Sequence, residues 1–168
     1  WAFTECSSLT SVTIPDSVTS IKRGTFAHCN RLRNITIPDS VTGIESQAFF
    51  GCSSLTSITI PDSVSVIWDR AFSGCARLNS ITMPNSVTGI GVGAFSNCTA
   101  LNHIIIPDSI TNIGGRAFYG CASLTSATFL GDAPKVSENA FNNATPTIYR
   151  KPEAKGWGDT FEGRPVKL

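Results

Sequence analysis

The sequence predicts a repeat solenoid, mostly β, in which short coils of chain stack along one axis. Cysteine recurs at a fixed interval of 23 residues, at Cys6, Cys29, Cys52, Cys75, Cys98 and Cys121. A leucine, a proline, a phenylalanine and several β-branched residues recur in step with it. Hydrophobic residues make up 41% of the chain and charged residues only 15%. Serine and threonine therefore supply most of the polar surface, and threonine suits an exposed sheet.

Each unit contains one clear strand pattern. In residues 55–60, Leu-Thr-Ser-Ile-Thr-Ile, apolar and polar side chains alternate as in a half-buried strand. Pro61 ends this strand because it has no backbone N–H to donate. Val64 to Ile67 is predicted to be a second short extended segment, and residues 71–75 have room for about one helical turn. One such unit cannot bury its own apolar edge, so neighbouring units must stack into ladders of identical side chains.

The recurring positions spell L-x-x-I-x-I-P-x-x-V-x-x-I-x-x-x-A-F-x-x-C-x-x. This unit resembles the BspA-like class of bacterial leucine-rich repeats, in six consecutive copies over residues 1 to about 129. The resemblance implies a right-handed leucine-rich-repeat solenoid with parallel strands and short helical turns. It also implies a secreted or cell-surface protein of bacteria or some microbial eukaryotes. Such proteins are often adhesins that bind host or matrix proteins, and the class has no shared catalytic residues.

The repeat loses its phase near residue 130. Leu130 occupies the proline position and Ala144 the cysteine position. We therefore expect tandem repeats over 1–129, the first one incomplete, and a degraded last repeat with a C-terminal cap over 130–168. Tyr149, Trp157 and Phe161 are expected to cover the apolar end of the stack, as a terminal cap must.

The N-terminal end of the stack has no comparable cap. Trp1 enters the pattern in the middle of a unit, so we expect further repeats or a cap upstream of it. Without them the first strand has an open edge, and such edges pair with other chains. Weak self-association through this end is the expected consequence.

The six cysteines are predicted to be buried free thiols. Equivalent residues of stacked strands lie about 4.8 Å apart with parallel side chains, whereas Cβ atoms in a disulfide prefer about 3.8 Å. Zinc sites use short local cysteine pairs and converging ligands, which a ladder does not offer. Disulfides and a metal site are the less favoured alternatives. A buried thiol otherwise behaves as a small hydrophobic group.

A second ladder consists of acidic or amide residues after the prolines: Asp16, Asp39, Asp62, Asn85 and Asp108. Stacked carboxylates suit calcium. However, Asn85 interrupts the row while keeping the side-chain oxygen that caps a turn. We therefore expect a structural turn at these positions and no metal.

The outward positions of the strands are candidate ligand contacts. They form two parallel polar rows, and the residues selected from them are Asn34, Thr36, Ser57, Thr59, Ser80, Thr82 and His103. The alternative is a generic polar sheet surface. A threonine array that orders water, as in ice-binding proteins, is disfavoured because His103 and Ile105 interrupt it.

Residues that the repeat does not require are a second source of candidates. Lys22, Arg23, Arg31 and Arg33 crowd into twelve residues with His28. Phe50 and Tyr119 share one register, and Trp68 lies near. Arginine, tryptophan and tyrosine are enriched at binding hot spots. Scattered solvated surface is the alternative interpretation.

These patterns favour a non-catalytic binding or adhesion module that recognises a protein or glycan. No acid, base, nucleophile and metal converge in the sequence, so we predict neither an enzyme nor a cofactor. The net charge of +1 gives no field that would attract nucleic acid, and no apolar run is long enough to insert in a membrane. The alternative function is a structural spacer in a larger extracellular protein. An extracellular or cell-surface location is expected in both cases.

Overall fold

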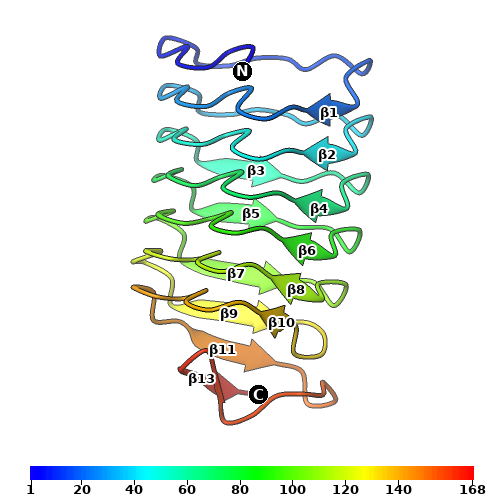
Figure 1. The fold of residues 1–168 in the computed structure, drawn as a ribbon, viewed down its shortest axis with the longest axis vertical. Helices are drawn as coiled ribbons and strands as arrows, with labels where there is room; N and C mark the ends of the chain where they lie inside the picture. The colour runs from blue at the N-terminus through cyan, green and yellow to red at the C-terminus, as the bar shows by residue number, and fades with distance from the viewer.

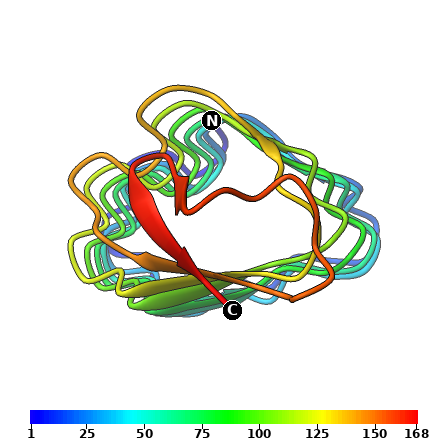
Figure 2. The same cartoon turned by 90° about the horizontal axis from the view of Figure 1, so that it is seen from below.

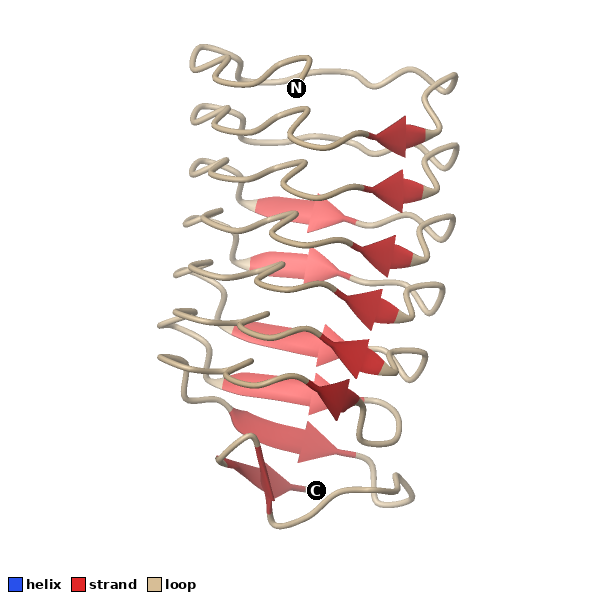
Figure 3. Cartoon of the chain, viewed as in Figure 1, coloured by secondary structure: helices blue, strands red, loops and turns tan.

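The computed structural model describes residues 1–168 as a β-solenoid, which confirms the predicted fold class (Figure 1). Strands on the near side point left and strands on the far side point right, while the chain advances from the top of the view to the bottom (Figure 3). The coils therefore form a right-handed superhelix. Its strands pair in parallel except at the C-terminal hairpin.

The small sheet contains one two-residue strand from each of six coils. Its strands are β1 (Ser20–Ile21), β2 (Gly43–Ile44), β4 (Val66–Ile67), β6 (Gly89–Ile90), β8 (Asn112–Ile113) and β10 (Lys135–Val136). They pair in this order at the 23-residue register, for example Ile21 with Ile44. This sheet corresponds to the second extended segment that the sequence predicts. β10 shows that the degraded repeat still completes a coil.

The opposite side of each coil carries the strand predicted at residues 55–60. These strands are β3 (Ser57–Thr59), β5 (Ser80–Thr82), β7 (His103–Ile106), β9 (Ser126–Phe129) and β11 (Thr147–Arg150). In the first two coils the same side is represented by the isolated bridge between Thr13 and Thr36. We call this side the large sheet. Its pairing is interrupted after Thr36 and again after β5.

The expected helical turn is absent, because the third side of each coil consists of tight turns. Two positions per coil have a left-handed backbone, as at Gln47 and Gly51, where φ is 61° and 70°. Left-handed residues cannot continue a right-handed helix. Backbone bonds between coils stabilise this side instead, for example from Phe49 N to Ala71 O at 2.8 Å.

A column of phenylalanine rings runs through the core. Adjacent rings stack with centroids 5.2–5.6 Å apart and planes within 15° of parallel, and the column comprises Phe3, Phe26, Phe49, Phe72, Phe95, Phe118 and Phe141. Offset stacks at this spacing are favourable beyond the area they bury. Except for Phe3, which is exposed in the first coil, the column belongs to one continuous cluster of 40 buried residues. Each coil is thus held by its neighbours.

The C-terminal segment crosses the end of the stack (Figure 2). Strands β12 (Thr160–Phe161) and β13 (Arg164–Lys167) form an antiparallel hairpin, and β13 extends the large sheet beyond β11. Trp157 and Phe161 pack edge-on against Phe129, at 4.9 and 5.5 Å between centroids. These two aromatics cover the core as expected. The expectation for Tyr149 is wrong: it occupies an outward strand position and is exposed.

Candidate binding surfaces

The thiol ladder is a structural feature, and no disulfide is present. Each buried cysteine donates its S–H to a phenylalanine carbonyl of the previous coil, as from Cys75 Sγ to Phe49 O at 3.2 Å. Burial raises the pKa of the Cys52 and Cys121 thiols to about 12. The prediction of six buried thiols is wrong in one place, because Cys6 in the first coil is only half-buried.

The aspartate row lies at turns, as predicted, but the expected Asx hydrogen bonds are absent. In each turn the proline carbonyl accepts the N–H three residues later, as Pro61 O accepts Val64 N at 3.0 Å. The serine after the aspartate joins successive coils, since Ser63 Oγ donates to Val41 O. Asp62 and its equivalents are exposed and make no side-chain bond of their own. No group of three or more His, Cys, Asp or Glu residues is placed to hold a metal.

The candidate residues of the large sheet form one exposed stripe. Ser57 lies opposite Ser80 and Thr59 opposite Thr82 in the paired strands β3 and β5, and His103 continues the stripe on β7. Asn34 and Thr36 lie one coil earlier, where strand pairing is interrupted. A hollow of about 330 Å³ opens at this interruption; it is lined by Asn34, Ile35, Thr36, Ile37, Asp39, Ser57, Ile58, Thr59 and Pro61.

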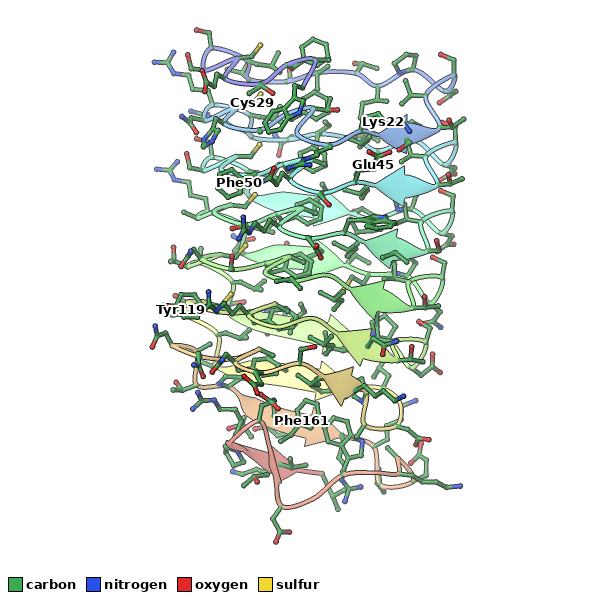
Figure 4. The ribbon with its side chains drawn as sticks, in the orientation of Figure 1. Lys22, Cys29, Glu45, Phe50, Tyr119 and Phe161 are labelled. Carbon is green, nitrogen blue, oxygen red and sulfur yellow. The ribbon has the colours of Figure 1, made fainter.

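The basic cluster of the sequence is divided between two sides of the coil. Arg31 and Arg33 are exposed in the segment that leads into the large sheet, whereas Lys22 and Arg23 follow β1 on the small sheet. Lys22 Nζ pairs with Glu45 Oε1 at 2.9 Å, and both lie beside β1 and β2 (Figure 4). This pair holds the pKa of the Glu45 carboxyl below its usual range.

Phe50 and Tyr119 share a register but lie three coils apart along one edge of the stack (Figure 4). His28 contacts Phe50 edge-on, with ring centroids 5.1 Å apart. These aromatic residues do not converge on a common hollow.

The structure also shows a surface on the small-sheet side that the sequence did not identify as a site, although Arg23 lines it. Trp68 directly follows β4 on the small sheet and is 52% exposed. It lines a hollow of about 380 Å³ with Ser20, Arg23, Gly43, Glu45 and Ser46. A neighbouring hollow of about 310 Å³ shares Arg23 and Ser46 and adds Gln47, Asp69, Arg70 and Val92. We call the two hollows together the Trp68 groove. Its signal in the sequence is a tryptophan in a register otherwise occupied by lysine, glutamate, glycine and serine.

The N-terminal end of the stack carries an apolar hollow of about 270 Å³. Phe3 and Val12 line it, together with the side chain of Trp1, which is 63% exposed. Arg23 lies over the Trp1 ring, with its Cζ atom 5.9 Å from the ring centroid.

The stacked coils, phenylalanine column and parallel register define a leucine-rich-repeat solenoid. The sequence profile of the BspA type leucine rich repeat region matches residues 1–125 in six copies. The chain belongs to this family. Comparison with curated proteins gives no match.

Solved structures of other leucine-rich repeat proteins show the same fold. The leucine-rich repeat protein of T. pallidum is 28% identical and superposes with a TM-score of 0.70, over 84% of this chain and 72% of that one. A leucine-rich repeat protein of Eubacterium ventriosum has the same fold at 22% identity, with a TM-score of 0.69. It matches 92% of this chain and 47% of its own length. The present structure contains no helix with the length and apolar character needed to cross a bilayer.

Proposed function

We propose that the chain is a non-catalytic binding module of a secreted or cell-surface protein, and that it recognises an extracellular protein through the large sheet. The hollow beside Thr36 and Thr59 carries this proposal. It opens where strand pairing is interrupted within the exposed stripe, and a recess among polar groups gives a partner side chain a place to insert. The ordered stack beneath it holds these groups in fixed register, which lowers the entropy cost of binding.

The proposal is tested with immobilised matrix proteins and two variants that add the same charge. Ser57→Arg fills the hollow with a long side chain, whereas Ser65→Arg changes an exposed serine outside it. We expect the first variant to weaken binding at least about tenfold, corresponding to about 1.4 kcal/mol, and the second to bind as the parent does. Equal binding by both variants would contradict a role for the hollow.

A spacer is the second candidate function, and the continuous core supports it. A spacer needs the stack but not the hollow. It therefore predicts that neither the parent nor the variants bind any matrix protein, while all of them fold with similar stability.

A further inference from the structure

We propose that the Trp68 groove binds an acidic glycan, with a pyranose ring stacked on the Trp68 indole and the sugar carboxylate held by Arg23 and Arg70. This surface follows the small sheet, so the inference is independent of the protein-binding role proposed for the large sheet. The exposure of one aromatic ring and the charges beside it support this binding mode.

The indole is uncovered because of the residues that follow it in register. Gly91 and Gly114 occupy the equivalent positions in the next two coils, so no side chain from them lies over the ring. A Cβ atom at Gly91 would come within 2.6 Å of the Trp68 carbonyl carbon, so a larger residue cannot be placed there without moving the backbone. The indole N–H of Trp68 donates no hydrogen bond within the chain, whereas the backbone N–H of this residue donates to Ile44 O at 3.3 Å. A flat, half-exposed ring with a free donor suits the C–H face and hydroxyl edge of a sugar.

The charges beside the ring favour an anionic group. Glu45 is already engaged, since its oxygens accept bonds from Lys22, from Ser20 Oγ at 3.1 Å and from Arg23 N at 3.1 Å. Neither Arg23 nor Arg70 forms an ion pair, because the chain contains only the Lys22–Glu45 salt bridge. The Arg23 guanidinium also lies over the Trp1 ring, with Cζ 5.9 Å from the ring centroid. The second hollow is thus lined by two arginines without an ion pair and by one carboxylate, Asp69, and a guanidinium can donate two hydrogen bonds to the oxygens of a carboxylate.

The remaining polar groups of the wall suit a sugar's hydroxyls. Asp69 Oδ1 accepts the Val92 N–H at 2.8 Å, which fixes this carboxylate. Ser46 lines both hollows. A neutral apolar ligand would leave these groups and both arginines without partners, at a cost that binding would have to overcome.

The test uses the full chain and hexasaccharides that contain glucuronate, galacturonate or mannuronate, titrated by calorimetry. The fully methyl-esterified galacturonate hexamer keeps the sugar rings and removes the charge. We expect at least one acid hexamer to bind, and Trp68→Ala to weaken that binding about tenfold or more. Arg70→Gln should weaken it similarly, and it introduces the residue that Gln47 already places at this register with the same left-handed backbone.

Two controls separate a built site from general attraction to polyanions. Arg116→Gln removes the same charge at the same register two coils away, and Ile105→Ala removes an equally exposed apolar side chain on the large sheet. Both variants should bind as the parent does. The proposal is overturned if no acid hexamer binds, if the esterified hexamer binds equally well, or if Arg116→Gln weakens binding as much as Arg70→Gln. Thermal melting of each variant confirms that it is folded, and Ser57→Arg should leave glycan binding unchanged.

Discussion

The thiol ladder makes the stability of the solenoid unusually sensitive to alkaline pH. Cys52, Cys75, Cys98 and Cys121 are buried, and burial raises the pKa of each thiol well above 9.0, to about 12 for the first and last. In the unfolded chain these thiols ionise near pH 9.0. Because the folded pKa is the higher one, the thiols contribute their full stability below pH 9 and lose it as the pH rises toward 12.

The loss in the free energy of unfolding is set by ionisation of the thiols in the unfolded chain, as long as the thiols of the folded chain stay protonated. At pH 10 each unfolded thiol with a pKa of 9.0 gains about 1.4 kcal/mol from ionisation. Four such thiols give a loss of roughly 5–6 kcal/mol, comparable to the whole stability of many domains, about 5–15 kcal/mol.

The assay is urea unfolding at pH 7 and pH 10 under reducing conditions, followed by tryptophan fluorescence. In the variant Cys75→Ala/Cys98→Ala, about half of the alkaline loss should disappear, leaving roughly 3 kcal/mol. Val64→Ala is the control, because it weakens the core without removing a thiol. A double variant that loses as much stability at pH 10 as the parent would refute the argument, as would a parent that loses less than about 2 kcal/mol.

Four further predictions concern the stack and its ends. Phe72→Ala should lower the free energy of unfolding in urea by about 4–5 kcal/mol, because the ring is buried and stacked on both sides. Phe3→Ala should lower it by less than half as much, because that ring is 41% exposed and has one stacking neighbour. Similar losses for both variants would mean that the phenylalanine column does not hold the coils together. Arg116→Gly should have a free energy of unfolding about 1 kcal/mol higher than Arg116→Ala, because φ at this position is 58°. The reverse order of stability would rule out backbone strain. Trp157→Ala should cost roughly 2–3 kcal/mol for its partly buried ring, and an unchanged melting temperature would exclude it from the cap. One consensus unit added before Trp1 should cover the apolar hollow, raise the melting temperature and suppress any self-association seen by sedimentation. An unchanged melting temperature would mean that covering this hollow does not stabilise the stack.

Most of the fold could be predicted because one period determines it. The register of Ile58 packs against the core in every coil for the same reason, so alternation within one unit and recurrence across units point to the same strand. The helical turn was wrongly predicted because the left-handed positions override the local spacing. Their signal was present in the sequence: glycine occurs in both registers, as at Gly51 and Gly93, while Gln47 and Arg70 conceal it.

The candidate sites were harder to predict, because residues that are near one another in the sequence can lie on different sides of the solenoid. Lys22 and Arg33 are eleven residues apart, about half of one 23-residue circuit, so they lie on different sides of the stack. Arg23 and Arg70 are 47 residues apart, one residue more than two full circuits, and line the same hollow. On a solenoid, surface neighbours are found by comparing registers, and a cluster within one unit is spread around the axis.

The same geometry explains why specificity can arise at Trp68 without cost to the fold. The buried registers must repeat, since a change there disturbs the coils on both sides. The register of Trp68 faces solvent and holds lysine, glutamate or serine in three other coils, although the close-packed backbone at Gly91 and Gly114 leaves no room for a side chain in two more. An exposed indole at such a position adds nothing to the core and exposes apolar area to water. The proposed glycan gives this residue a role, and Trp68→Ala should leave the urea midpoint nearly unchanged while it weakens glycan binding about tenfold or more.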